Sequence, residues 1–223
     1  MTTRRKLLMI KIDYFTDVLC IWAFINERRI EELAKEYGDD IEIHHHYVDV
    51  FGAVEEKMQA QWQAKGGYPG FREHVFESAG QFQLSLDDSV WDTCRPTSSA
   101  PAHLYGKAIA IVYGSQSELH WLSGLRNAFF NQGRDISQVS VLRQLLTDLE
   151  FEAQPVIAQI ESGDALAHLM SDRKKSDNLK IKGSPSMVMN DGRQILLGNV
   201  GYGIIRANIE ELLQDKSAHA SWC

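Results

Sequence analysis

One cysteine, Cys20, lies where an apolar run turns into a helical pattern, within the segment FTDVLCIWAF at residues 15–24. A thiol at such a junction is either a small buried residue or a nucleophile. At the start of a helix, unpaired backbone N–H groups and the helix dipole favour the thiolate, which is the form that attacks disulfides. Asp17, three residues upstream, disfavours the thiolate if its carboxylate is close. The residues alone leave this balance open.

The other two cysteines, Cys94 and Cys223, form no C-x-x-C pair and no zinc-ligand spacing with Cys20. In a reducing compartment each can remain a free thiol. We interpret Cys94 as structural or incidental. The tail at residues 217–223 reaches at most about 25 Å when extended, so Cys223 is a candidate to pair with Cys20 or with a partner subunit.

The composition limits the class of protein. The chain has 223 residues, is 44% hydrophobic and 24% charged, and carries a net charge of −7. The acidic balance argues against nucleic-acid binding. The longest apolar run, residues 18–25, is too short to cross a bilayer, and Lys11 and Asp13 interrupt any signal-peptide core. We therefore expect a cytoplasmic protein without a membrane partner.

The first fifty residues predict a strand, a helix and a second strand. Residues 7–15 are apolar enough for a central strand, and residues 22–37 repeat apolar side chains near the helical period before Gly38. Residues 41–50 alternate like a half-buried strand. The short connections favour a parallel βαβ unit.

The rest of the chain predicts a helical block and then a hairpin. Strand signals return at residues 186–190 and 193–198, joined by Asp191-Gly192, and a last helix follows at 204–214. The predicted domains are 1–50 with 178–216 as one discontinuous unit, 51–177 as an all-helical insertion, and 217–223 as a flexible tail. The helices expected in the insertion cover 53–65, 71–81, 101–114, 117–132, 137–148 and 155–175, the last broken near residues 162–163.

This order of elements resembles the DsbA family of the thioredoxin-like fold. Three segments carry the resemblance. The first, FTDVLCIWAF, resembles the active-site segment of the family. The second, NAFFNQGRDISQVSVL (127–142), resembles a stretch typical of the cytoplasmic branch with FrnE-like proteins, and the third, GSPSMVMNDGRQILLGNVGYG (183–203), resembles the cis-proline hairpin. The resemblance implies an α/β thioredoxin-like fold with a large all-helical insertion between its βαβ and ββα halves.

The chain departs from the usual family pattern at the active-site segment. Ala23 stands where the family has its second cysteine, and Ile21 replaces the common proline. In this respect the segment is similar to kappa-class glutathione transferases and 2-hydroxychromene-2-carboxylate isomerases, which place a serine where Cys20 stands.

The resemblance assigns Cys20 as the catalytic residue and a groove beside it. Ser184 would offer its backbone groups to a peptide or to glutathione, and the bond to Pro185 would be cis. Gly198 and Asn199 fall where kappa-type relatives bind the γ-glutamyl end of glutathione; the alternative is a polar turn.

Two further residues complete the predicted substrate or glutathione site. Trp22, in the first helical turn, would either wall the site or pack in the core. His103 belongs to the segment that resembles the cap over the site. It would hold the thiolate or act as an acid, or else be a packed histidine.

The run His44-His45-His46 predicts no metal site. On a strand His44 and His46 share one face and His45 opposes them, so each face offers too few ligands for a closed site.

Three functions follow from these residues. The first is a DsbA-like thiol-disulfide oxidoreductase that acts through Cys20 alone on a small thiol or a peptide or protein disulfide, with an external thiol as resolving group. Its co-substrate would be glutathione, with no bound cofactor. The second is a glutathione-dependent transferase or isomerase, and the third is a non-catalytic binding protein. A homodimer is compatible with the resemblance, because relatives often pair.

Overall fold

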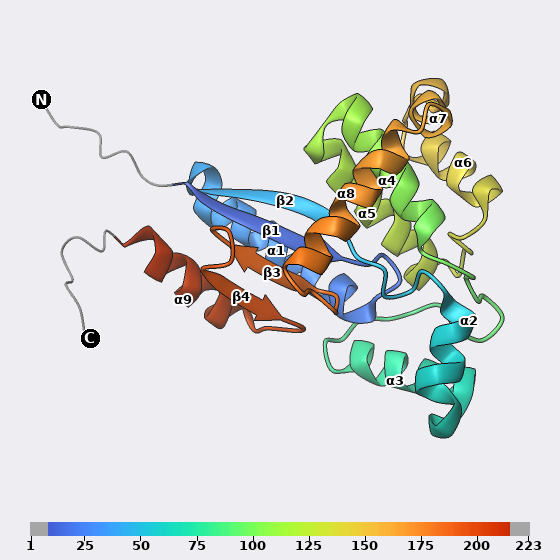
Figure 1. The fold of residues 1–223 in the computed structure, drawn as a ribbon. Helices are drawn as coiled ribbons and strands as arrows, with labels where there is room; N and C mark the ends of the chain where they lie inside the picture. Colours follow the sequence, from blue (N-terminus) through green and yellow to red (C-terminus); the bar gives the residue numbers. More distant parts are fainter. Residues whose placement is uncertain (1–8, 215–223) are drawn as a thin grey trace, which may run out of the picture.

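The computed structural model describes residues 9–214, which form a four-stranded sheet and a set of helices (Figure 1). The strands are β1 (Ile10–Thr16), β2 (Ile41–Tyr47), β3 (Ser186–Met189) and β4 (Gln194–Leu197), in the order β2-β1-β3-β4. β1 pairs parallel with β2 and antiparallel with β3, and β3 pairs antiparallel with β4. The sheet is therefore mixed, as the βαβ and ββα halves predict.

The βαβ half closely follows the sequence pattern. Helix α1 (Ile21–Tyr37) begins directly after Cys20 and ends at Gly38, whose φ of +49° favours glycine and whose N–H group donates to the Ala34 carbonyl. A 3-10 turn (Gly38–Asp40) then leads into β2. β2 ends at Tyr47, three residues before the predicted strand end, and the predicted strand start at residue 7 lies outside the described residues.

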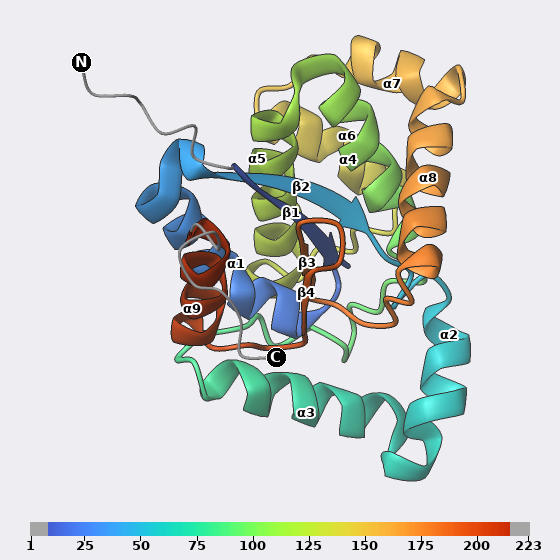
Figure 2. The same ribbon diagram turned by 60° about the vertical axis from the view of Figure 1, so that its left-hand side comes forward.

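The helical insertion lies between β2 and β3, and helices occur near all the expected positions. Helix α7 ends before Gly163 and α8 starts after it, at the predicted break, with Gly163 at φ +88°. The helices are α2 (Val54–Lys57) continued by a π-helical turn (Met58–Trp62) and a 3-10 turn (Gln63–Lys65), α3 (Gly67–Gly80), α4 (Ala100–Tyr113), α5 (Ser115–Arg126) continued by a π-helical turn (Asn127–Asn131), α6 (Val139–Asp148), α7 (Ala153–Glu161) and α8 (Asp164–Asn178). Figures 1 and 2 both show α2 and α3 as an arm set apart from the bundle of α4 to α8.

The C-terminal half is a hairpin and a helix. Asp191 and Gly192 connect β3 to β4 with φ values of +56° and +96°, which is the backbone that a tight primed turn requires. Helix α9 (Tyr202–Leu213) follows and packs on the same side of the sheet as α1, where Ile205 and Ile209 join one apolar cluster with Ile12.

The two faces of the sheet have different partners. Tyr14 and His45 pair in register on the α1 face, with their rings 5.3 Å apart. Asp13 and His46 point to the opposite face, where α8 lies. This is the alternation expected for a strand, and it separates His45 from its two histidine neighbours.

Among residues 9–214, no helix combines the length and the apolar character that crossing a membrane requires.

A buried cation joins the insertion to the free edge of β2. The Lys107 ammonium on α4 donates to the His45 carbonyl at 2.9 Å and pairs with Asp172 at 2.9 Å and Glu118 at 3.1 Å. Asp172 also accepts from the Tyr47 N–H group at 3.0 Å. Backbone groups at the outer edge of β2 thus bond to side chains of the insertion, which protects an edge that otherwise invites pairing with another chain.

We expect Lys107→Met to lower the free energy of unfolding by about 3–5 kcal/mol, because it leaves the carboxylates of Glu118 and Asp172 buried without their cation. Denaturant unfolding followed by circular dichroism measures the change. Lys35→Met removes an exposed ion pair with Glu32 and should change stability by less than about 1 kcal/mol. Equal losses for the two variants would show that the Lys107 contacts contribute no more than an exposed pair.

Candidate active site

The Cys20 thiol lies at the first turn of α1. Cys20 is the N-cap residue, and its carbonyl accepts hydrogen bonds from the N–H groups of Ala23 (3.0 Å) and Phe24 (3.1 Å). Its Sγ atom donates to the Ser184 carbonyl oxygen at 3.1 Å, although 164 residues separate the two in sequence. Only 5% of Cys20 is exposed. The thiol is therefore at the predicted helix end, but nearly covered.

The loop before β3 forms the other side of this contact. The Ser184–Pro185 peptide bond is cis. The Ser184 hydroxyl accepts a hydrogen bond from the Asp17 N–H group at 2.9 Å, and the Pro185 carbonyl accepts one from the Gly198 N–H group at 2.8 Å. The loop is thus attached on one side to the segment before Cys20 and on the other to the end of β4.

Asp17 lies at the centre of a buried network below the thiol. Its side chain is fully buried, and its carboxylate accepts hydrogen bonds from the N–H groups of Leu19 (3.0 Å) and Phe51 (2.8 Å) and from the Ser99 hydroxyl (2.9 Å). Burial nevertheless raises the pKa of Asp17 to about 6, because the three donors only partly replace water around the charge. One carboxylate therefore connects the active-site turn, the chain after β2 and the start of α4.

His103 belongs to this network rather than to an open cleft. It is 1% exposed, stacks on Tyr47 with ring centroids 4.5 Å apart, and accepts a hydrogen bond from the Val18 N–H group through Nε2 at 3.2 Å. Burial lowers the pKa of His103 to about 3, so the ring is neutral at physiological pH. These contacts are those of a packed histidine, which was one of the two alternatives for His103. The ring lies against the backbone of Val18.

Burial decides the ionisation of Cys20, a contribution that the sequence does not reveal. It raises the pKa of the thiol, and the charge of Asp17 acts in the same direction. The N–H groups of Ala23 and Trp22 and the Ser184 side chain favour the thiolate, but they do not overcome burial. In the protein without a bound substrate, burial therefore decides the balance that the residues alone left open, in favour of the protonated thiol.

Lys57 is a nearby cation that the sequence pattern did not single out. The charges of Cys20 and Asp17 both raise its pKa, although burial outweighs them and lowers it. Its ammonium lies 4.8 Å from the centre of the Phe51 ring. No motif marks Lys57, because only the path of the chain after β2 brings it near the thiol.

Trp22 packs against the α2–α3 arm. The half-buried ring meets His74 and Phe82 edge-on, at centroid distances of 6.1 and 6.5 Å. These contacts connect the first turn of α1 to α3, so Trp22 packs against the arm, and its role as a wall of the site stays a prediction.

Gly198 and Asn199 lie after β4. Gly198 has a φ of +76°, and the Asn199 side-chain oxygen accepts a hydrogen bond from Arg29 on α1. That oxygen is already engaged, and the amide N–H₂ group is the part of Asn199 that remains for a ligand.

Cys20 and Cys94 are both free thiols among the described residues. Cys94 is buried, and burial raises its pKa to about 11. Cys223 lies outside the described residues. His46 bonds to Asp172 (2.7 Å) and Asp13 (2.8 Å), acidic partners that the sequence did not suggest. Within residues 9–214, no group of three or more potential ligands is placed to hold a metal ion.

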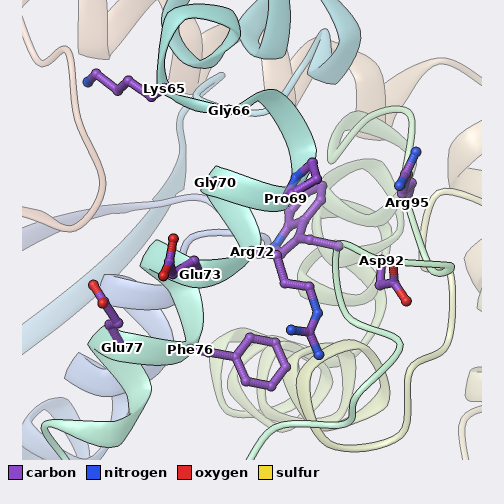
Figure 3. Close-up of a pocket in the computed structure, with 11 residues that line it drawn as sticks. Lys65, Gly66, Pro69, Gly70, Arg72, Glu73, Phe76, Glu77, Asp92 and Arg95 are labelled. Atoms are coloured by element: carbon purple, nitrogen blue, oxygen red, sulfur yellow. The ribbon is translucent and has the colours of Figure 1, made fainter.

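A cavity of about 900 Å³ lies between α3 and the segment that carries Trp91, Asp92 and Arg95. Figure 3 shows Pro69, Arg72 and Phe76 along one side of the helix, facing the segment that carries Asp92 and Arg95. Arg72 stacks on Phe76 and donates to the Asp88 carbonyl. The cavity does not include Cys20 or the Ser184–Pro185 loop, so we do not place the candidate site there.

Comparisons with known proteins report on the family and the fold of the chain. Residues 11–210 match the family described as the DSBA-like thioredoxin domain. No curated protein matches the chain. Among solved structures, a proposed protein disulfide isomerase from Nitrosomonas europaea has 15% identity and a TM-score of 0.74, covering 95% of this chain and 99% of its own. The cytosolic disulfide reductase DsbM from Pseudomonas aeruginosa has 20% identity and a TM-score of 0.68, covering 91% and 98%, and is also known with GSH.

The alkylation of Cys20 should report its raised pKa. In a Cys94→Ser, Cys223→Ser background, we expect the iodoacetamide rate to rise with a midpoint above the ordinary cysteine value, because burial disfavours the thiolate. Asp17→Asn should move the midpoint to lower pH by removing a nearby negative charge. Asp88→Asn, which removes a fully exposed carboxylate, should leave it unchanged. A wild-type midpoint below the ordinary value would contradict the effect of burial.

The pKa of Asp17 also predicts how stability depends on pH. An acid whose pKa rises from 3.8 to about 6 on folding binds more protons in the native state between these values. Stability is therefore lost as the pH rises through this window. Relative to Asp17→Asn, we expect the wild type to lose about 2 kcal/mol of unfolding free energy between about pH 4 and about pH 7. Denaturant titrations at each pH measure the difference, and a constant difference would refute the raised pKa.

Proposed function

Because the chain belongs to the family of DSBA-like thioredoxin domains, we propose that it is a thiol-disulfide oxidoreductase that acts through one cysteine. The observation that carries the proposal is the contact of 3.1 Å between the Cys20 sulfur and the Ser184 carbonyl beside Pro185. A thiol at a helix start, next to an extended loop, is suited to exchange with a disulfide laid along that loop.

The exchange would run in two steps. The Cys20 thiolate attacks one sulfur of a substrate disulfide, forms a mixed disulfide and releases the other sulfur as a thiolate. A second thiolate then attacks the substrate sulfur of the mixed disulfide, releases Cys20 and carries away the oxidised pair. Ala23 has no sulfur, so it cannot perform this second step. We propose glutathione as the external thiol and the cytoplasm as the compartment that supplies it.

The contacts around the sulfur support the first step. The Ser184 side chain and the N–H groups of Ala23 and Trp22 stabilise the thiolate once it forms. The Ser184 carbonyl, which accepts a hydrogen bond from the thiol in the free protein, is a backbone group that a substrate peptide could engage once the thiol is deprotonated. Burial keeps the resting thiol protonated, which lowers its reactivity towards unbound electrophiles.

A second candidate is a glutathione-dependent transferase or isomerase, and one observation favours it. The Cys20 thiol already acts as a hydrogen-bond donor at 3.1 Å. A protonated thiol with a raised pKa could donate in the same way to the thiolate of a bound glutathione, without forming a disulfide.

We expect the wild type to catalyse the glutathione-dependent reduction of 2-hydroxyethyl disulfide, and Cys20→Ser to show only the uncatalysed rate. Mass spectrometry of the protein treated with glutathione disulfide should show one glutathione adduct on Cys20. Cys94→Ser is the matched control, since it removes a buried thiol outside the site, and it should retain full activity.

Other outcomes would identify the alternatives. If Cys20→Ser still binds glutathione and still conjugates it to 1-chloro-2,4-dinitrobenzene, the transferase candidate replaces the oxidoreductase. If the wild type is inert in both assays, the chain is a binding protein on this fold, and the proposal is wrong.

A further inference from the structure

A second cavity lies where the sheet meets the helical insertion. Its volume is about 780 Å³, which is within the range of small-molecule sites. Tyr14 and His45 lie at its floor on the strands, α1 forms one wall with Ile30, and α5 forms the other with Leu122 and Arg126. The elements that line it can be followed in Figure 2. Neither Cys20 nor the Ser184–Pro185 loop lines it, so it is not part of the site described above.

Two residues that line this cavity, His45 and Arg126, carry buried polar atoms without partners. Both ring nitrogens of His45, which is 8% exposed, lack a hydrogen-bond partner among the described residues. The same holds for Nε of Arg126, which is 3% exposed. A buried polar atom left unpaired costs about 1–3 kcal/mol, so a polar ligand group that reached these three atoms beside the cavity would remove a cost that the chain itself does not offset.

The charge of Arg126 is only partly balanced. One terminal nitrogen donates to the Thr16 hydroxyl at 2.7 Å, and the other lies 3.6 Å from the Glu27 carboxylate, too far for a hydrogen bond. Burial lowers the pKa of His45 to about 3, and the charge of Arg126 adds to this. A neutral His45 offers one N–H donor beside the guanidinium.

The walls and the entrance limit the class of ligand. Large aliphatic side chains line part of the walls and suit a hydrocarbon body, while Gln116 and Ser123 add polar groups. The aliphatic residues are Ile30, Ile41, Ile43, Leu119 and Leu122. Glu31, Glu42 and Lys35 line the cavity and are exposed, so the carboxylates outnumber the ammonium there and disfavour ligands with several negative charges. A ligand with a single carboxylate suits the polar end of the cavity, because guanidinium N–H groups pair with carboxylate oxygens in a planar fork.

We propose that this cavity binds a small organic acid, with its carboxylate on Arg126 and His45 and its apolar body between α1 and α5. The ligand would join the sheet to the insertion at a point where the chain leaves polar groups unpaired. This site is independent of the exchange chemistry at Cys20.

The test uses 4-phenylbutyrate as the probe and its neutral amide as the matched ligand, followed by ¹H–¹⁵N NMR of the full chain. The acid should bind saturably, with shifts concentrated at the amides of α1, β2 and α5. His45→Phe removes both unpaired nitrogens but keeps a ring against Tyr14, so it should fold normally. It should weaken binding of the acid about tenfold, as loss of a hydrogen bond to a charged group predicts.

Two controls make the outcome decisive. His168→Phe changes an exposed histidine on α8, which does not line the cavity; its affinity should equal that of the wild type. Cys20→Ser should also bind the acid normally, which separates this test from that of the proposed function. The proposal is wrong if the acid shows no saturable binding at millimolar concentration, if the amide binds equally well, or if His45→Phe retains full affinity.

Discussion

The buried carboxylate of Asp17 is the interaction on which the candidate site depends. It receives hydrogen bonds from the turn before α1, from the chain after β2 and from Ser99 at the start of α4. The backbone N–H group of Asp17 donates a hydrogen bond to the Ser184 hydroxyl. Four segments that are distant in sequence therefore meet at one residue. A carboxylate can do this because its two oxygens offer several acceptor positions in a fixed plane.

This arrangement has a consequence for the chemistry of Cys20. The carboxylate that orders the turn is also a negative charge near the thiol, and both its charge and the burial that it shares with the thiol raise the pKa of Cys20. The N–H groups at the start of α1 act in the opposite direction. The carboxylate that orders the turn thus raises the pKa of Cys20, whereas activation of the thiol requires a lower pKa. In the free protein the result is a protonated sulfur bonded to the Ser184 carbonyl.

A second set of buried charges attaches the insertion to the sheet. Lys107, Glu118 and Asp172 meet at the free edge of β2, while His46 and Asp13 continue the contacts on the α8 face. On the α1 face, Arg126 bonds to Thr16 but leaves one nitrogen unpaired next to His45. The insertion is therefore held by polar contacts at the edge of the sheet. The cavity between α1 and α5 lies on the α1 face, where its polar atoms are incompletely paired.

The local patterns of the sequence determined the elements and their order. Apolar periodicity defined α1, the Asp191-Gly192 pair defined the hairpin turn, and Gly163 broke α7 from α8, because each of these depends on neighbouring residues. The position of Cys20 at a helix start follows from the same patterns. Only the tertiary structure decided the burial of Cys20, the contact of its sulfur with Ser184, the acidic partners of His46 and the proximity of Lys57. These depend on residues up to 164 positions apart, and ionisation responds to what surrounds a group in space rather than to what precedes it in the chain.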